Sequence, residues 1–496
     1  MTAQTILPAN SVTGAYEVDG SVLFVPAQST KLTFTQGTPT NTKKMTIAFW
    51  VKFCNTITSD AQEIFTGGAD GSNESFIRLN GNQQFQVRHD HASDTSWQVI
   101  PHRTFQDESG WVHFVVAIDT TQGTASNRVK IYVNGVQETH LLAANYPAED
   151  ETNFWNTDGD GVTIGNRNYS GDGYGDYYMS EFCFIDGSAE APTKFGEFDP
   201  DTPTVWRPIN PLVNTFGTNG VYLKLSLAGQ STNAAGIGAD SSGNGNHYAQ
   251  SNIAAIYAAR QDTPSNNFCT MIKHHASSSP WALSNGNLTC IQTAGATNGL
   301  YAGSMMVTKG KWYWEGNIAE AGSGDRSRFG MVNYDSVTSN AFSTCQGSFS
   351  GVESSCKSAK HFDTVSGSTT EHTNSGDFAD DDIMQWAIDL DNNAIYIGRN
   401  GTYLTQSGNS GGDPTSGASK TGAISTSTTI MNGGPMTPYA GHSAGTSDRT
   451  FVTFNFGNPP YAPSSGNADA NGYGNFEYAP PSGYFAICSK NLAEYG

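Results

Sequence analysis

Four aspartates stand on tight, glycine-rich turns in the second hundred residues of the chain. They occur in the runs DGDG and DGYGD, where short turns bring carboxylate oxygens close together. Hard oxygen ligands of this kind suit Ca²⁺, so the sequence predicts a calcium site. The alternative is that Asp and Gly serve only as good turn formers. The predicted metal ligands are Asp158, Asp160, Asp172 and Asp176.

A second set of candidate side chains is aromatic. Sugar binding uses aromatic faces beside Asn, Asp and Gln on exposed loops, because an aromatic ring offers a flat apolar surface to a sugar ring. Four aromatic residues lie in polar, turn-rich segments and fit this description, although loop aromatics can equally pack at the rim of a core. The predicted ligand-binding residues are Trp97, Tyr169, Tyr174 and Tyr177.

No catalytic residues are predicted. Glycoside hydrolysis needs two carboxylates about 5–10 Å apart on one sheet face, which a pattern such as E-x-D-x-x-E on a strand would supply. The chain has no such pattern: Glu63 precedes an apolar pair, and Glu315 stands alone in its predicted strand. No G-x-S-x-G nucleophile motif occurs either. We therefore expect a protein that is not an enzyme.

The seven cysteines form no C-x-x-C pair and no zinc-ligand spacing. Cys54, Cys183 and Cys488 lie inside apolar strand patterns and are expected to be buried thiols. Cys345 and Cys356 flank a polar segment and could close a disulfide, a question that the sequence leaves open.

Charge excludes some partners. The formal net charge is −20, which disfavours nucleic acid and anionic membranes. No stretch approaches the 18 or so apolar residues of a membrane span. The first residues, MTAQTILPANSV, lack the basic and apolar regions of a signal peptide, so we expect synthesis in a cytoplasm without export by the usual route.

The elements that must position these residues are strands. Apolar residues alternate with other residues over 45–53, 112–118 and 129–133. Asn134-Gly135 predicts a two-residue type I′ hairpin, and Asn80-Gly81 predicts the same turn between its flanking strands. Charged residues make up only 14% of the chain, and no convincing amphipathic helix occurs. The predicted fold class is therefore all-β.

Composition divides the chain into three parts. We expect a β-sandwich over residues 1–190, then a Pro/Gly-rich connector over 191–268 that packs on the first sandwich, and a second β-sandwich over 269–496. The two sandwiches are predicted to stand in tandem.

The first part resembles the laminin-G-like, concanavalin-A-like jelly roll. The strand Trp111 to Ala117, a polar turn and the hairpin segment Lys130 to Gly135 recur in that family in this order, and the match covers about residues 20–190. The resemblance implies a jelly-roll sandwich that sometimes binds calcium at its loops.

The last part resembles a SPRY-type sandwich, another concanavalin-like jelly roll, over about residues 300–490. The long segment around 335–380 departs from the compact members of that family. The segments that carry the resemblance are Gly310 to Glu315, Phe329-Gly330, Gln385 to Asp391, Ile395 to Gly401, Phe454 to Gly457 and Pro480 to Tyr484.

The whole combination resembles a group of structural proteins of tailed bacteriophages, many of them marine. Three connector motifs carry it: Gly196 to Asp199, Asp240 to Asn246 and Asp262 to Phe268. It implies a virion protein, such as a tail fibre or receptor-binding protein that recognises a host surface glycan or protein. A homo-oligomer, for example a trimer, would raise the avidity of weak sites. The alternatives are a capsid decoration or head-fibre protein and a polysaccharide-active glycoside hydrolase.

Overall fold

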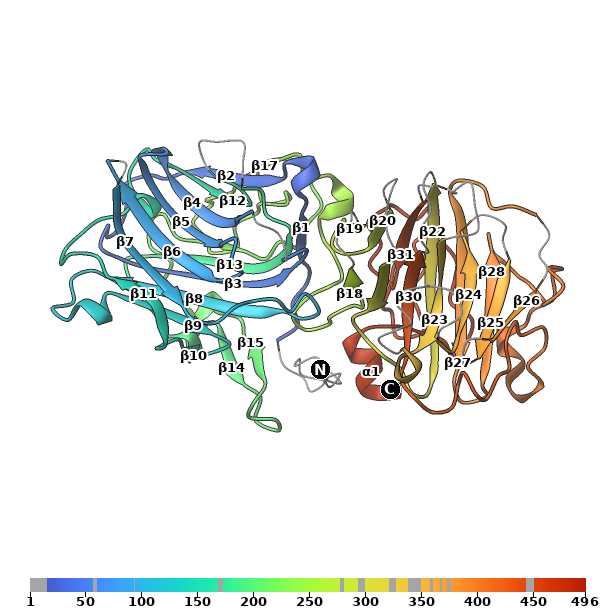
Figure 1. The fold of residues 1–496 in the computed structure, drawn as a ribbon. Coiled ribbons are helices and arrows are strands. Elements are labelled where there is room, and N and C mark those ends of the chain that lie inside the picture. The colour runs from blue at the N-terminus through green and yellow to red at the C-terminus, as the bar shows by residue number, and fades with distance from the viewer. Residues whose placement is uncertain are drawn as a thin grey trace. The chain divides into compact units, whose positions relative to one another are not determined.

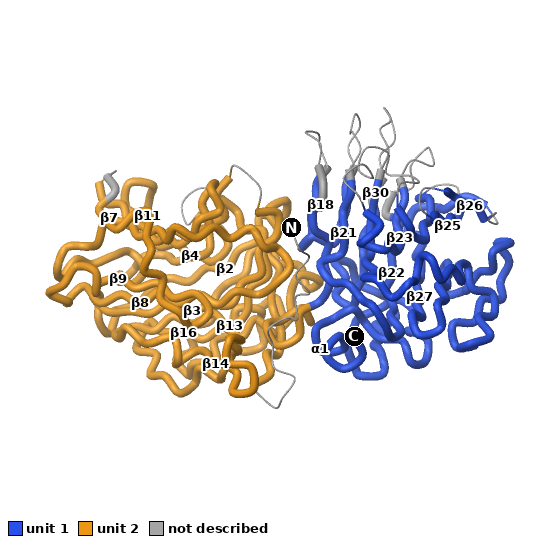
Figure 2. Tube along the Cα trace, turned by 60° about the horizontal axis from the view of Figure 1, so that its bottom comes forward, with its two compact units in different colours: residues 1–7, 268–496 blue, residues 8–267 orange. Residues whose placement is uncertain are grey.

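The computed structural model confirms an all-β fold, with 43% of residues in strands and 8% in helices. The chain forms two compact units, one running to Asn267 and the other from Phe268 to Gly496 (Figure 2). We call them the N-terminal and C-terminal units. The structure describes residues 16–56, 60–92, 94–167, 173–276, 281–292, 299–320, 327–337, 349–356, 360–365, 368–372, 376–442 and 450–496.

The N-terminal unit is a sandwich of two antiparallel sheets (Figure 1). The seven-stranded sheet has the order β1-β13-β3-β8-β9-β10, and β16 also pairs with β13. Its strands are β1 (Val22–Phe24), β3 (Lys44–Phe53), β8 (Val112–Asp119), β9 (Val129–Val133), β10 (Val136–Gln137), β13 (Tyr177–Asp186) and β16 (Val221–Leu223).

The eight-stranded sheet of this unit has the order β11-β7-β6-β5-β4-β12-β2-β17. Apolar residues at alternate positions of both sheets meet between them, for example Phe49, Ile77, Val87 and Phe114. On the eight-stranded sheet, polar residues such as Arg78 and Gln86 alternate with these core residues and lie on the outer face. The strands are β2 (Lys31–Thr35), β4 (Gln62–Asp70), β5 (Asn73–Leu79), β6 (Phe85–His91), β7 (Asp94–Pro101), β11 (Leu141–Asn145), β12 (Gly161–Ile164) and β17 (Ala249–Ser251).

One of the two predicted hairpin turns is confirmed and the other is wrong. Asn134 and Gly135 have positive φ values of 46° and 79° and join β9 directly to β10, as a type I′ turn requires. Asn80-Gly81 instead begins a longer loop, in which Gln83 takes the left-handed conformation. The Asn80 side chain accepts hydrogen bonds from the backbone N–H groups of Asn82 and Gln84 and so stabilises this wider loop.

The segment after β13 continues on the N-terminal unit. Its strands β16 and β17 join the two sheets, and β14 (Gly196–Phe198) pairs with β15 (Trp206–Pro208). Phe195 and Phe216 pack against Val115 and Cys183 on the outer face of the seven-stranded sheet. Trp206 donates a hydrogen bond to Nδ1 of His113 at 3.0 Å, so this face is covered by the chain itself.

The C-terminal unit is a second sandwich, with sheet orders β18-β21-β30-β23-β24-β25-β26 and β19-β20-β31-β22-β27-β28-β29. Trp314 and Trp386 stack in its core, with ring centroids 5.0 Å apart. The strands are β18 (Met271–Ala276), β19 (Trp281–Ser284), β20 (Thr289–Gln292), β21 (Gly299–Gly303), β22 (Lys311–Glu320), β23 (Ser327–Asn333), β24 (Gly351–Ser355), β25 (His361–Val365), β26 (Ser368–His372), β27 (Asp382–Asp389), β28 (Ala394–Arg399), β29 (Thr402–Tyr403), β30 (Met436–His442), β31 (Thr450–Asn455) and β32 (Phe485–Ala486).

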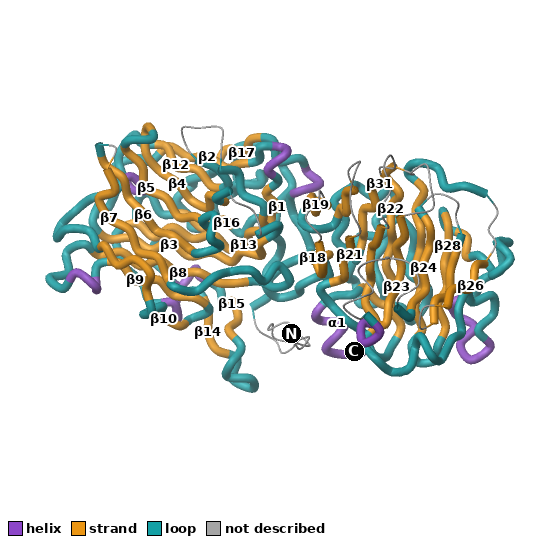
Figure 3. Tube along the Cα trace, viewed as in Figure 1, coloured by secondary structure: helices purple, strands orange, loops and turns teal. Residues whose placement is uncertain are grey.

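Helices are short in both units (Figure 3). In the described residues, no helix is long and apolar enough to cross a membrane. The α-helix α1 spans Ser489–Tyr495, and the 3₁₀ turns are η1 (Pro26–Gln28), η2 (Ala125–Asn127), η3 (Phe154–Asn156), η4 (Pro192–Lys194), η5 (Pro211–Val213), η6 (Ala255–Tyr257), η7 (Tyr334–Ser336) and η9 (Pro414–Ser419).

Buried polar groups tie loops to these sheets. In the C-terminal unit, the Glu315 carboxylate on β22 accepts hydrogen bonds from Tyr313, Asn455 and the backbone N–H groups of Glu477 and Tyr478. Glu315 is therefore a fully bonded anchor for the segment before β32, and this accounts for its isolated position in the strand pattern.

The cysteine predictions are confirmed where the structure tests them. Cys54, Cys183 and Cys488 are buried free thiols. Cys356 is also a buried free thiol, and burial raises its pKa. Cys345 lies outside the described residues, and the structure shows no disulfide at Cys356 among the residues that it describes.

Candidate functional site

A groove of about 520 Å³ opens on the N-terminal unit where β4 and β5 meet the loop between β12 and β13. It combines acidic, basic and aromatic side chains, unlike the groove of about 350 Å³ on the C-terminal unit, whose lining carries no charge. The groove is lined by Pro26, Asp60, Ala61, Glu63, Arg78, Arg167, Gly173 and Tyr174.

Glu63 is the most buried charged group in the groove, with 1% of its side chain exposed. Burial raises its pKa to about 7, and the nearby guanidinium groups of Arg78 and Arg167 oppose that rise. Nη1 of Arg78 donates to Oε1 of Glu63 at 3.3 Å. Oε2 of Glu63 is buried and has no hydrogen-bond partner among the described residues. Glu63 therefore lies beneath the floor of the groove, with one carboxyl oxygen buried and unbonded.

The backbone around Glu63 holds it in place. Its N–H donates to the carbonyl of Gly173 at 2.9 Å, and its carbonyl accepts from the Tyr177 hydroxyl, which reaches it from β13. Gly173 has φ of +71°, and a Cβ there would lie 2.7 Å from Cγ of Glu63. Glycine thus lets the loop approach the carboxyl side chain closely.

Polar side chains continue from the groove across the outer face of the sheet. Arg78 on β5 donates from Nε to Gln86 on β6 at 2.8 Å, and Gln86 donates to Gln98 on β7 at 3.0 Å. Together with Glu63 on β4 they form a row across four adjacent strands, which we call the polar row. Each member orients its neighbour through these hydrogen bonds.

A second ion pair borders the polar row. Arg167 donates to the Glu74 carboxylate on β5, which is 2% exposed. Phe76 lies between Glu74 and Arg78 on the same face of β5. The Arg78 guanidinium lies 4.4 Å from the centre of the Phe76 ring. The Arg78 guanidinium is therefore held in one orientation by its hydrogen bonds and by the Phe76 ring, as recognition of hydroxyl or carboxylate oxygens requires.

The predicted aromatic residues divide into three groups. Tyr174 lines the groove and is half-buried. The placement of Trp97 and Tyr177 on exposed loops is wrong, because both lie in strands with exposures of 1% and 0%. Trp97 packs against Trp155 in the core. The side chains of Trp97 and Tyr177 are therefore both out of reach of a ligand. Tyr169 lies outside the described residues.

Among the described residues, the predicted calcium ligands Asp158, Asp160 and Asp176 belong to no cluster of three possible metal ligands. Asp158 is exposed and accepts a hydrogen bond from Thr38, Asp160 lies half-buried in the turn before β12, and Asp176 is buried before β13. Burial, with a smaller effect of Glu108, raises the pKa of Asp176 to about 7. Asp172 lies outside the described residues. In the part of the chain that the structure describes, no cluster of three acidic, histidine or cysteine side chains could hold a metal ion.

Sequence reasoning missed Glu63, Glu74, Arg78 and Arg167 as site residues. The available signal was the alternation of Glu74, Phe76 and Arg78 with the core residues of β5, which marks a charged outer face. What the alternation could not show is that a loop after β12 closes over one end of that face.

Comparison with known protein families assigns a domain type to part of the N-terminal unit. Residues 26–187 match the family model described as the concanavalin A-like lectin/glucanases superfamily, of laminin G type. No curated protein matches the chain in sequence. The N-terminal unit therefore contains a laminin G-like, concanavalin A-like domain.

Solved structures that resemble parts of the chain do so at a low level. A SAP-like pentraxin from Limulus polyphemus is 15% identical, with 36% of this chain and 80% of that one covered and a TM-score of 0.27. The SPRY domain of human HERC1 is 14% identical, with coverages of 35% and 91% and a TM-score of 0.26. Domains LG4-5 of the mouse laminin α1 chain are 10% identical, with coverages of 98% and 91% and a TM-score of 0.30. Scores this low carry no argument about function.

Proposed function

We propose that this chain is a non-enzymatic adhesive protein of a tailed-phage virion, a tail fibre or receptor-binding protein. In this proposal, the groove at Glu63 and the polar row beside it bind a glycan of the host surface. The observation that carries the proposal is the row itself: fixed donors and acceptors cross four strands of a lectin-type sheet, with Tyr174 at one end.

The chemistry of the groove fits a polyhydroxylated ligand. Arg78 supplies N–H donors and is oriented from below by Glu63, and the ring of Tyr174 offers an apolar surface for a sugar face. The opposite sheet is covered by Phe195, Phe216 and Trp206, which leaves the eight-stranded sheet as the open face. A calcium requirement stays a separate proposal that involves the turns at Asp158 and Asp172.

The virion assignment depends on the connector motifs and on the SPRY-like pattern of the C-terminal unit. Asp240 accepts hydrogen bonds from the backbone of Tyr222, Ser242 and Asn246, so the motif at 240–246 is a structural loop of the lectin domain. Such motifs would be retained for architecture whatever glycan is bound. We further propose a homo-oligomer, such as a trimer, in which several weak sites act together.

Binding to a glycan panel tests the proposal. Arg78→Met keeps the length of the side chain and removes the guanidinium, and we expect it to weaken binding of the best oligosaccharide at least tenfold, a loss of about 1.4 kcal/mol. The matched control is Arg103→Met, which removes an arginine that is 53% exposed and paired with Glu138. Equal binding by wild type and Arg78→Met would contradict the assignment of the groove.

One observation favours a second function. A carboxyl group with a pKa near 7, such as Glu63, is suited to donate a proton in glycoside hydrolysis, and Glu74 lies near enough to influence that pKa. Hydrolysis would be established if the wild-type protein releases reducing ends from a polysaccharide and Glu63→Gln abolishes this release.

Labelling the protein on intact virions separates a tail location from capsid decoration.

A further inference from the structure

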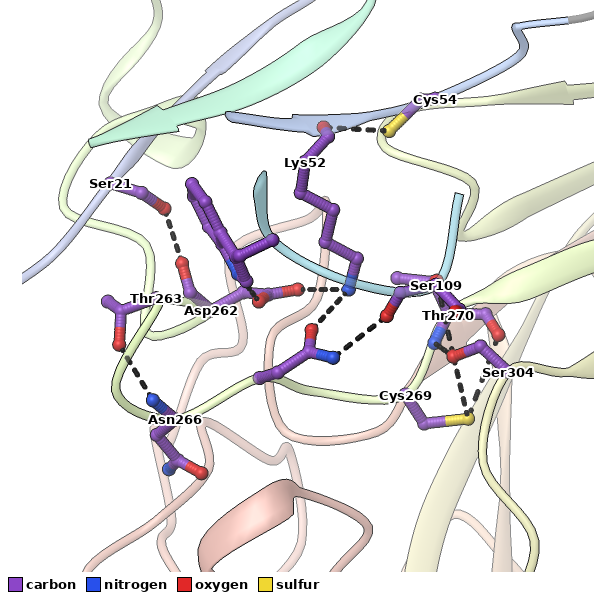
Figure 4. Close-up of polar contacts among 12 residues, drawn as sticks. Ser21, Lys52, Cys54, Ser109, Asp262, Thr263, Asn266, Cys269, Thr270 and Ser304 are labelled. Atoms are coloured by element: carbon purple, nitrogen blue, oxygen red, sulfur yellow. Dashed lines mark hydrogen bonds and ion pairs between the residues drawn. The ribbon is translucent and has the colours of Figure 1, made fainter. Parts of the chain in front are cut away.

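A lysine is fully buried in the N-terminal unit, next to an asparagine and an aspartate. Lys52 lies on β3, and both it and Asp262 have side chains that are 0% exposed. Nζ of Lys52 lies 2.9 Å from Oδ2 of Asp262 and 2.7 Å from Oδ1 of Asn267 (Figure 4). Asn267 is itself 2% exposed, so all three functional groups are removed from water.

The surroundings fix the orientation of each group. Nε1 of Trp111 donates to Oδ1 of Asp262 at 2.8 Å, which turns the other carboxylate oxygen toward Lys52. Nδ2 of Asn267 donates to the carbonyl of Ser109 at 2.8 Å, which directs the amide oxygen toward Nζ. The ring centre of Tyr178 lies 5.8 Å from Nζ. These contacts hold an amine, an amide and a carboxyl group in a dry, partly aromatic site.

We propose that Lys52 and Asn267 form a covalent isopeptide bond, with Asp262 as the proton carrier. Nζ passes one proton to Oδ2 of Asp262 and attacks Cγ of Asn267, forming a C–N bond and a tetrahedral intermediate. The amide nitrogen Nδ2 takes up the proton from Asp262 and leaves as ammonia when the Cγ–Nδ2 bond breaks. The remaining extra proton of Nζ goes to that ammonia, so the products are a secondary amide, an ammonium ion and the restored Asp262 carboxylate.

Geometry and burial both favour this reaction. The carbon under attack is bonded to the oxygen that Nζ contacts at 2.7 Å, so with a C=O bond of about 1.2 Å it lies within about 3.9 Å of Nζ, and a rotation of the amide would bring it into position for attack. A charged pair without water is costly, and transfer of a proton across 2.9 Å converts Lys52 and Asp262 to neutral groups. The neutral amine is the nucleophile that the step needs.

The bond would connect strand β3 to a residue 215 positions further along the chain. Asn267 is the last residue of the N-terminal unit, so the bond would close that unit covalently just before the C-terminal unit begins. The described cysteines are free thiols. An isopeptide bond would therefore supply the constraint that a disulfide gives elsewhere, without an oxidising compartment.

Mass spectrometry of the purified full-length chain tests the proposal. We expect an intact mass lower than the sequence mass by one ammonia, and a branched proteolytic peptide that joins the segments around Lys52 and Asn267. An unchanged mass with two separate linear peptides would overturn the proposal. Loss of ammonia within one linear peptide would overturn it too, because that result indicates a cyclic imide at an asparagine.

Variants then assign the roles. Asp262→Asn keeps the shape of the side chain and removes the proton carrier, so we expect the full mass and no branched peptide. Lys224→Met removes a half-buried lysine that pairs with Asp19 outside this site, and it should retain the lower mass. If Asp262→Asn does not fold, the wild-type peptide map still decides whether the bond exists. A branched peptide in folded Asp262→Asn would overturn the role of Asp262 as proton carrier.

Discussion

At the scale of single residues, Glu63 shows how a sheet can hold a carboxyl group in an unusual state. Its side chain is almost completely buried, and its raised pKa of about 7 follows mainly from that burial. A folded-state pKa above the unfolded value means that the folded protein binds the proton more tightly. The contribution to stability is then full below about pH 4.5 and is lost as the pH rises through about 7.

This predicts a measurable difference between wild type and Glu63→Gln. The free energy of unfolding of wild type should fall between pH 4.5 and 7.5 by up to about 3 kcal/mol more than that of the variant, because a glutamine side chain cannot ionise. Denaturant unfolding at several pH values measures both profiles. Glu371→Gln, which changes a glutamate that is 49% exposed, should follow wild type. Parallel profiles for wild type and Glu63→Gln would contradict the raised pKa, because they would show that the pKa of Glu63 is the same in the folded and unfolded states.

At the scale of elements, the β9–β10 hairpin depends on one glycine. Gly135 has φ of +79°, and a Cβ there would lie 2.3 Å from the ring of Trp206, which packs over this hairpin. We expect Gly135→Ala to destabilise the N-terminal unit by about 2–4 kcal/mol through backbone strain and displacement of the ring. Thermal unfolding measures the loss. Gly123→Ala is the matched control, because no atom lies within 4 Å of its added Cβ.

The two Asn-Gly dipeptides show the limit of local signals. The dipeptide at 134–135 forms the tight turn that its sequence predicts, whereas that at 80–81 does not. The wider loop at 80–84 is stabilised by the Asn80 side chain, and its Gln83 carbonyl accepts a hydrogen bond from Phe105, far away in sequence. The type of turn that an Asn-Gly dipeptide forms therefore depends on contacts with residues outside the dipeptide.

At the scale of the whole molecule, the main hydrophobic core of each sandwich draws only on its own unit. One core contains residues from Val22 to Ala258, and the other contains residues from Cys269 to Ile487. We expect two calorimetric unfolding transitions, because each core can be lost without exposing the other. Gly135→Ala should lower the temperature of one transition and leave the other unchanged. A single transition that shifts as a whole would contradict this independence.

The sequence by itself determined the all-β class, the jelly roll over about residues 20–190, which the family model matches over 26–187, and the buried thiols at Cys54 and Cys183. These properties follow from the alternation of apolar residues and from the apolar neighbours of the cysteines, both of which can be read directly from the sequence. Only the tertiary structure decided that Trp97 and Tyr177 are core residues and that Glu63 meets Arg78 and Arg167 in one groove. The same holds for Lys52 and Asn267, which are 215 residues apart. Such contacts between distant residues depend on the order of the strands in a sheet and on which loop covers it. Neither can be read from the periodicity of the sequence.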